Sequence, residues 1–268
     1  MPATDFLRGG QVSDALKALE SEVRKDPSAS KHRVFLFQLL SVLGAWDRAA
    51  TQLGVAGDLD AKALPMVQTY RTALNCEALR ASVFAGERSP LVFGDPEEWI
   101  ARLLEALRLT ATGRHAEAER MRESGLGAAP ATPGQIDGQA FEWIADADSR
   151  IGPVCEAIVN GKYYWIPFQR LQAIEIEPPA DLRDCVWMPV RLTFASGGES
   201  VALISTRYPG SETHADDMIR TARKTEWSQV SGATYLGLGQ RMYATDAGEY
   251  ALMDVRRIEL KPGVGQAN

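Results

Sequence analysis

Cysteine is scarce in this 268-residue chain, and its placement excludes two common kinds of stabilisation. The three cysteines are Cys76, Cys155 and Cys185, and they form no CxxC or other metal-ligand spacing. A disulfide framework and a structural zinc site are therefore not expected. We expect reduced, partly buried thiols, as is usual for a cytoplasmic protein.

Basic residues are also fewer than acidic ones. The chain carries 29 Lys and Arg against 35 Asp and Glu, a net charge of −6, and most of that excess lies in residues 136–268. Proteins that bind nucleic acid usually present a basic patch or stripe. The charge balance therefore predicts no nucleic-acid partner.

Long apolar runs are absent as well. No stretch approaches the roughly 18 apolar residues that a membrane-spanning helix needs. The start, Met1-Pro2-Ala3-Thr4-Asp5, lacks the positive charge and apolar segment of a signal peptide. The sequence therefore predicts a cytoplasmic protein without a membrane partner, long enough for two domains.

The chain does contain an internal sequence repeat with a spacing of 34 residues. A turn glycine, an apolar residue two places later, an alanine and a leucine occur twice, as Gly10, Val12, Ala15 and Leu19 and again as Gly44, Trp46, Ala49 and Leu53. This is the period of tetratricopeptide repeats, in which two helices are joined by a tight turn. A third copy starts at Gly113, so the unit between is degenerate or carries an insertion. Such repeats usually bind other proteins, which favours an adaptor.

Apolar periodicity predicts that the first half is helical throughout. The expected helices are residues 13–24, 33–43, 46–53, 63–83, 96–110 and 115–123. Asp95 followed by Pro96 is typical of a helix start. The stretch 125–135 is rich in glycine, alanine and proline, and we interpret it as an interdomain linker.

The second half changes to the alternating pattern of β-strands. Strands are expected at residues 154–159, 162–167, 171–177, 186–194, 200–205, 241–245 and 250–255, with a short helix at 216–223. Asn160-Gly161 predicts a two-residue hairpin turn. The expected fold class is α+β: tetratricopeptide-like α-α repeats in residues 1–130, then a small, mainly antiparallel β domain in residues 131–268, shaped as a partly open barrel.

Asp146, Asp148 and Arg150 lie close to Trp143 and form the densest polar cluster. Two carboxylates at this spacing suit acid–base chemistry or a divalent ion. The favoured alternative is a turn in which the acids cap backbone amides and pair with Arg150.

The strand 162–167 places Tyr163 and Trp165 on one face. Tyr164 and Ile166 lie on the other face. One of the two faces must be core, and the other is either an exposed surface for a peptide or is covered by the helical domain; the pattern alone does not decide which face is which. A triad of Ser211, His214 and Asp216 is disfavoured, because the nucleophile-elbow motif is missing and the three residues are too close in sequence to converge.

Several uncommon runs in the second half occur together in one known family. They are FEWIADADSR at 141–150, NGKYYWIPF at 160–168, LRDCVWMP at 182–189, TRYPGSE at 206–212, RKTEW at 223–227, GQR at 239–241 and DVR at 254–256. In order and spacing these runs resemble the ImpE/TagJ/SciE family, accessory proteins of bacterial type VI secretion.

The resemblance implies a cytoplasmic, non-enzymatic accessory protein with no catalytic residue, cofactor or metal to carry over. Its implied partner is an N-terminal helix of the small contractile-sheath subunit, with a link to the AAA+ ATPase that recycles the sheath. The candidate partner-binding surface comprises Trp143, Asp146, Asp148, Arg150, Tyr163, Trp165, Arg207 and Tyr208.

Three points stay open at this stage. The sheath helix would lie either in the concave repeat surface or in the seam between the domains near Trp143 and Tyr163. A metal-assisted hydrolase using Asp146 and Asp148, with His214 as an optional third group, is the alternative function. An oligomeric structural component of the secretion baseplate is a third hypothesis.

Overall fold

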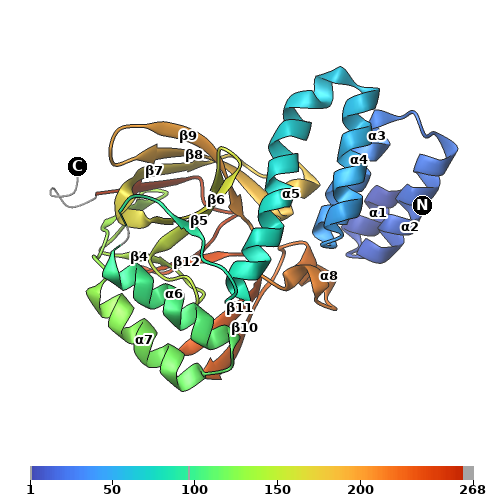
Figure 1. Ribbon diagram of the computed structural model, residues 1–268. Coiled ribbons are helices and arrows are strands. Elements are labelled where there is room, and N and C mark those ends of the chain that lie inside the picture. The colour runs from blue at the N-terminus through green and yellow to red at the C-terminus, as the bar shows by residue number, and fades with distance from the viewer. Residues whose placement is uncertain (1, 96, 262–268) are drawn as a thin grey trace.

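The computed structural model describes residues 2–95 and 97–261, with helices in the first half of the chain and strands in the second (Figure 1). The helices are α1 (Ala3–Arg8), α2 (Val12–Lys25), α3 (Ser30–Val42), α4 (Trp46–Leu59), α5 (Leu64–Phe84), α6 (Glu98–Ala111), α7 (His115–Ala128) and α8 (Asp217–Arg220). Short 3₁₀ turns lie at η1 (Ala61–Ala63), η2 (Phe168–Arg170), η3 (Leu182–Cys185) and η4 (Ser211–Thr213). The class is therefore α+β, as the sequence predicts.

The three copies of the sequence repeat form the same turn. Gly10, Gly44 and Gly113 have φ angles of 69°, 67° and 74°, a region that glycine enters without steric cost. In each turn the glycine N–H donates to the carbonyl three residues back, and the next N–H donates to the carbonyl five residues back. Each glycine therefore ends one helix of a pair, and the second helix starts two residues later.

The degenerate unit between the second and third copies is α5. This helix runs for 21 residues without a break, and it has Pro65 in its first turn, where proline is tolerated. It lies between the N-terminal helices and the sheet (Figure 1). The chain then forms β1 (Leu91–Val92) before entering α6, which explains why the third copy falls out of register.

The described strands form one large and two small sheets. The strands are β2 (Gly134–Ile136), β3 (Gln139–Phe141), β4 (Ile144–Asp146), β5 (Val154–Val159), β6 (Lys162–Pro167), β7 (Leu171–Ile176), β8 (Trp187–Phe194), β9 (Glu199–Ser205), β10 (Thr225–Ser231), β11 (Thr234–Gly239), β12 (Met242–Thr245), β13 (Glu249–Ala251) and β14 (Arg257–Leu260). The nine-stranded sheet has the order β1-β6-β5-β9-β8-β7-β14-β2-β3; β10-β11 and β13-β12-β4 form the others. The large sheet has free edges at β1 and β3, so it is open and does not close into a barrel.

The predicted hairpin at Asn160-Gly161 is confirmed. Both residues have positive φ, 49° and 74°, as the two-residue turn that matches strand twist requires. The turn joins β5 to β6 in antiparallel register, with Val154 opposite Pro167. The alternation predicted for 186–194 is confirmed from Trp187 onward, since Met188 and Val190 belong to one core and Trp187 to the other. Val186 departs from it, because it precedes the strand and lies in the same core as Trp187.

Three local predictions are corrected. The linker predicted at 125–135 is mostly structured: α7 continues to Ala128, Gly125 packs against the α6 backbone, and β2 begins at Gly134. Strands β10 and β11 were not expected, because their residues are polar and glycine-rich. Helix α6 begins at Glu98, and the proposed start at Pro96 lies outside the described residues.

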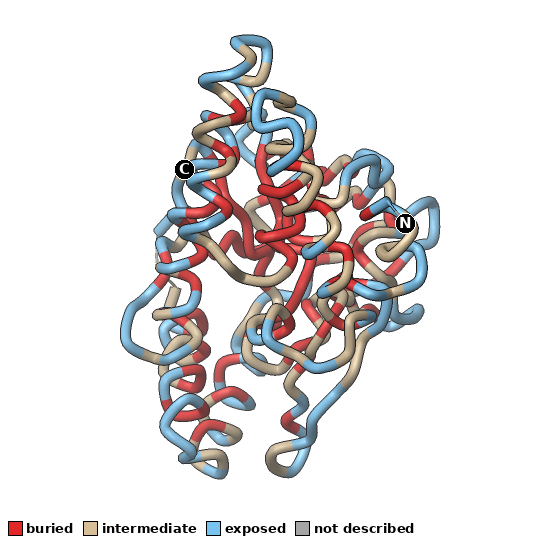
Figure 2. The backbone as a smooth tube through the Cα atoms, turned by 90° about the vertical axis from the view of Figure 1, so that its right-hand side faces the viewer, coloured by how far each residue is buried: buried red, intermediate tan, exposed pale blue. Residues whose placement is uncertain are grey.

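Two hydrophobic cores lie on opposite faces of the large sheet. One contains residues from α1 to α6 together with Tyr163, Trp165 and Trp187. The other contains mainly aliphatic residues of the strands, with a few aromatic rings such as Phe168 and Tyr243. Figure 2 shows the buried segments running through the centre of the molecule and exposed segments at its periphery. The first core continues across the boundary predicted near residue 130, for example from Leu103 in α6 to Val154 in β5. Independent folding of two domains stays a prediction.

Candidate functional site

Most of the residues predicted to form a partner-binding surface are in the interior. Six of the eight are buried, namely Asp146, Asp148, Tyr163, Trp165, Arg207 and Tyr208. Arg150 is half-buried, and Trp143 is exposed. The six buried residues therefore form no surface in this structure. Their polar groups are hydrogen-bonded to other interior groups, which offsets the cost of burying them.

Glu156, in the middle of β5, is the centre of this buried network. Its carboxylate accepts hydrogen bonds from Arg80 on α5 and from Arg241, which lies just before β12. The Tyr163 hydroxyl donates to it at 2.8 Å and accepts in turn from Trp165 Nε1 at 3.0 Å. The face of β6 that carries Tyr163 and Trp165 is thus covered by the helical layer, which decides between the two possibilities left open by the pattern.

The two arginines determine the protonation of Glu156. Burial alone would raise the pKa of this carboxyl, but the charges of Arg80 and Arg241 outweigh it and lower the pKa to about 2. Glu156 therefore stays ionised at neutral pH. Glu77, one turn before Arg80, accepts from Trp187 Nε1 at 2.7 Å and has its pKa raised by burial.

Asp146 forms the second half of the network. It pairs with Arg241, and it accepts from the Tyr208 hydroxyl at 3.1 Å and from the Asp148 amide at 2.9 Å. Burial raises the pKa of Asp146 to about 6, opposed by the charge of Arg241. Tyr208 lies flat over the backbone of Gly237, where a Cβ would be 2.3 Å from the ring. Close packing therefore explains this glycine, which lies in strand β11.

Asp148 does what the favoured interpretation of the cluster predicts. Its carboxylate accepts from the Arg150 amide at 2.8 Å and from the Arg150 guanidinium, and it also accepts from the Gly237 amide at 2.7 Å. His214 lies in another loop, where its Nδ1 accepts from the Asp216 amide at 3.1 Å. Within the described residues, no group of three His, Cys, Asp or Glu side chains is placed to hold a metal ion. The hydrolase hypothesis gains no support from this arrangement.

Arg207 connects the C-terminal half to the ends of two helices. It is 4% exposed and donates to the carbonyls of Ser41 and Val42 at the end of α3, and to Arg220 at the end of α8. Helix C-termini carry partial negative charge, so a guanidinium is favourable there. Burial lowers the pKa of Arg207 to about 10, which still leaves the side chain charged at neutral pH.

The sequence analysis missed three central members of this network: Arg80, Glu156 and Arg241. A signal exists for one of them, because Glu156 interrupts the apolar strand Val154–Val159. A charge in such a position requires a partner. The identity of the partner is not contained in the local pattern, since Arg80 and Arg241 are 76 and 85 positions away.

Two concave surfaces remain as candidates for partner binding. The first, which we call the helical groove, has a volume of about 660 Å³ and lies between α1, α3, the start of α5 and the segment before η3. Its half-buried apolar wall consists of Val34, Phe35, Met66 and Leu182, and its polar lining includes Lys31, Gln38, Asp60, Lys62 and Asp181.

The second, which we call the Trp143 pocket, has a volume of about 260 Å³ and lies between α7, β4, β12 and the β10–β11 hairpin. Trp143 and Leu126 line it and are 41% and 42% exposed. The rest of the lining is mostly alanine, glycine and the paired aspartates.

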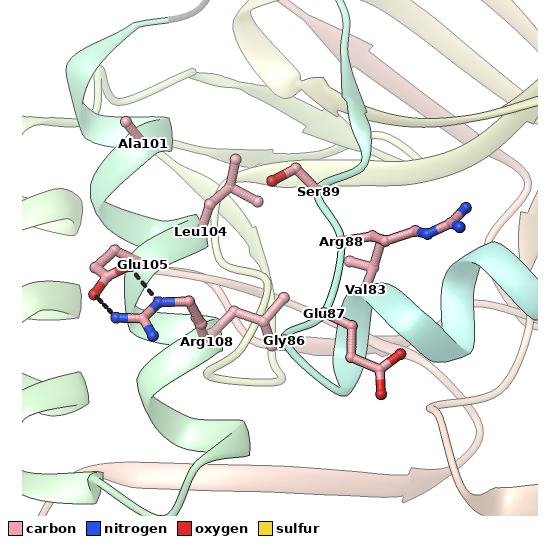
Figure 3. A pocket seen from close by; sticks show the side chains of 10 residues that line it. Val83, Gly86, Glu87, Arg88, Ser89, Ala101, Leu104, Glu105 and Arg108 are labelled. Atoms are coloured by element: carbon pink, nitrogen blue, oxygen red, sulfur yellow. Dashed lines mark hydrogen bonds and ion pairs between the residues drawn. The ribbon is translucent and has the colours of Figure 1, made fainter.

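A further pocket of about 450 Å³ lies between the end of α5 and α6 (Figure 3). Its rim is charged, with Arg108 and Glu105 joined across one turn of α6 by a 2.8 Å hydrogen bond. Exposed pairs of this kind contribute little binding energy. Its lining offers only a small apolar surface.

Comparison with known proteins identifies the group to which this architecture belongs. Residues 138–259 match the ImpE protein family. Over 262 residues the chain is 53% identical to the type VI secretion system accessory component TagJ of Pseudomonas aeruginosa, covering 98% of this chain and 92% of that protein. The chain belongs to the ImpE family.

The crystal structure of protein VPA1032 from Vibrio parahaemolyticus has the same fold. It superposes with a TM-score of 0.89 at 22% identity, and the match covers 98% of each chain. The ImpE family match starts after α7, so it includes the buried network of Asp146, Glu156 and Arg241 but not the helices that line the helical groove. Among the described residues, no helix has the length and apolar character needed to cross a bilayer.

Proposed function

We propose that this protein is a cytoplasmic, non-enzymatic accessory component of a type VI secretion system. Support comes from its 53% identity to TagJ over almost the whole of both chains. We further propose that its partner is the N-terminal helix of the small contractile-sheath subunit, and that this contact links the sheath to the AAA+ ATPase that recycles it. The helical groove is the proposed binding site.

The observation that carries this proposal is the lining of the helical groove. It is formed by α1, α3 and the start of α5, the first helices of successive repeat units. First helices line the concave surface of a tetratricopeptide array. The shared glycine turns and the buried alanines Ala15, Ala49 and Ala118 support tetratricopeptide-like packing of these pairs. An amphipathic helix would lie against such a surface with residues at i, i+3, i+4 and i+7 as anchors.

The charges of the helical groove favour an acidic partner helix. Asp181 pairs with Arg183, which offsets its charge, whereas Asp60 accepts from the neutral Lys62 amide at 2.9 Å. Lys31 and Lys62 are exposed, and their ammonium groups form no ion pair among the described residues. A helix with an apolar stripe flanked by Asp or Glu would therefore find complementary charge.

Gln38 adds a polar requirement. It is 6% exposed and lines the helical groove, yet its side-chain amide has no hydrogen-bond partner in the part of the chain that the structure describes. The polar atoms of this amide are not among the fully enclosed, unpartnered ones, so they reach the groove. A polar side chain on the partner helix could hydrogen-bond to this amide, and such a bond would favour one register of binding.

Calorimetric titration with a synthetic N-terminal helix of the cognate small sheath subunit tests the proposal, with a scrambled peptide as control. We expect saturable binding of the native peptide alone. Phe35→Ala should weaken it roughly tenfold or more, as for a buried aromatic anchor. Val201→Ala, at an exposed site on β9, should leave it unchanged. Equal affinity for both peptides, or an unaffected Phe35→Ala variant, would place the sheath helix elsewhere.

A further inference from the structure

The Trp143 pocket is separate from the helical groove and has its own chemistry. Trp143 belongs to the short link between β3 and β4, and Leu126 lies near the end of α7. Both side chains are about two-fifths exposed and line the same hollow, whose remaining walls include four alanines as well as charged side chains. Large apolar side chains scattered singly on a surface are ordinary, but two that share one apolar hollow mark an interaction site.

Two carboxylates of α7 line this hollow, and two more lie close to Trp143 in the chain or by hydrogen bond. Glu119 and Glu123 line it from α7, and Glu142 directly precedes Trp143. The Glu142 amide donates to Asp246 at 2.7 Å, which places a fourth carboxylate beside the tryptophan. None of these four acids forms a salt bridge among the described residues. Glu119 accepts from Ser231 and from the Ala233 amide, and these hydrogen bonds hold its pKa below the usual value, so it stays ionised.

The positive charge in the lining belongs to a buried side chain that is already hydrogen-bonded within the protein. Among the described residues that line the pocket, Arg122 is the only cation, and it is buried. Its guanidinium donates to Thr234 at 2.6 Å and to Thr110 at 3.1 Å, which joins α7 to β11 and α6. The Asp146 and Asp148 carboxylates behind the pocket are neutralised by Arg241 and Arg150. The solvent-facing charge is therefore negative.

We propose that the Trp143 pocket is a second docking site, which takes a basic segment of a protein partner. The segment places one aliphatic or aromatic side chain between Trp143 and Leu126. Flanking lysines or arginines then face Glu119, Glu123 and Glu142. Complementary charge speeds association and fixes orientation, while the apolar anchor supplies most of the affinity. With the helical groove favouring an acidic helix, the protein would hold two partners of opposite charge at once.

The test uses fluorescence anisotropy of the full chain with a labelled peptide that has a central leucine and two lysines on each side. The matched peptide replaces the lysines with glutamates. We expect saturable binding of the lysine peptide and none of the glutamate peptide. Trp143→Ala should weaken binding roughly tenfold, the loss typical of an interface anchor.

Charge reversal separates the pocket from the general acidity of the chain. Glu123→Lys should abolish most of the binding, whereas Glu87→Lys changes the net charge equally at an exposed site near α6 and should not. Phe35→Ala in the helical groove should leave the lysine peptide unaffected, and Trp143→Ala should leave the sheath peptide unaffected. Failure of one site can thus be distinguished from failure of the other.

Three results would overturn the proposal. The first is that the lysine peptide does not bind, and the second is that Glu123→Lys and Glu87→Lys weaken its binding equally. The third is a dimer in light scattering that Trp143→Ala dissociates, since a second copy of the chain would then occupy the pocket. Quenching gives an independent check that needs no peptide. The fluorescence lost in Trp143→Phe should be quenched more strongly by caesium than by iodide, and the reverse order would contradict an acidic rim.

Discussion

The two faces of the large sheet are both buried, but they are built from different residues. The face away from the helices is apolar and mainly aliphatic, with Ile166, Leu192 and Ile204 fully buried, and it includes a few rings such as Phe168. The face toward the helices combines aromatic rings with the ion pairs of Glu156. Aliphatic packing is tolerant of direction, whereas a buried ion pair is favourable in one geometry only. The comparison indicates that one face supplies stability and the other fixes how α5 lies on the sheet.

The largest loss of stability is expected from a substitution on the face toward the helices, which carries the ion pairs and which we call the charged face. Arg241→Met leaves Asp146 buried without its cationic partner and leaves Glu156 with only one of its two arginines. Removing one partner of a buried pair typically costs about 3–5 kcal/mol. Urea unfolding followed by circular dichroism would measure it, with Arg108→Met, at an exposed pair on α6, as the matched control. Equal stability of the two variants would mean that the network is not needed for folding.

A comparable but slightly smaller loss is expected on the aliphatic face. Leu192→Ala creates a cavity beneath the sheet, which costs about 2–5 kcal/mol in other cores. The two losses should differ in kind. Leu192→Ala should change stability equally at pH 4 and pH 7, whereas Arg241→Met should not. A pH-dependent loss in Leu192→Ala would show that the two faces are not independent.

The pH profile should separate the two carboxylates of the charged face. Asp146 has a raised pKa of about 6 in the folded protein. Its contribution to the free energy of unfolding is therefore fully present below the pKa that it has in the unfolded chain, and it is lost as the pH rises through 6. The lowered pKa of Glu156, about 2, has the opposite sign: its contribution is lost as pH falls through that value. Unfolding free energies measured from pH 2 to pH 8 should show both slopes.

Asp146→Asn provides the control for this profile. The unmodified protein should lose stability on the order of 1–3 kcal/mol between pH 4 and pH 7, and this loss should be absent in Asp146→Asn. The loss of stability at acid pH that comes from Glu156 should remain. If the profile of the variant matches that of the unmodified protein throughout, Asp146 titrates normally and the assignment is wrong.

The smallest effect concerns one hydroxyl. Tyr163→Phe removes the donor to Glu156 and the acceptor of Trp165 Nε1, which leaves a buried indole N–H unpaired. Such a loss costs about 1–3 kcal/mol. Met188→Leu, a substitution of similar volume on the aliphatic face, should cost less. If Tyr163→Phe is the milder of the two, the hydroxyl bonds are not part of what fixes α5.

Local features of the chain were predictable wherever one residue type determines the backbone. The turn glycines Gly10, Gly44 and Gly113 all take positive φ, and Asn160-Gly161 forms the expected hairpin. The family could also be named from the runs of residues 141–256. The error concerned burial: aromatic and charged residues such as Tyr163, Trp165 and Arg207 were assigned to a surface because such residues usually bind partners.

The sequence by itself determined the helix pairs, their 34-residue period and the alternating strands, because each depends on residues within one or two turns of one another. Only the tertiary structure decided which face of β6 is covered and which arginines neutralise Glu156. It also decided that Trp143 is exposed and lines a pocket together with Leu126. These outcomes depend on contacts between residues far apart in the chain, such as Arg80 with Glu156, and no local periodicity encodes them.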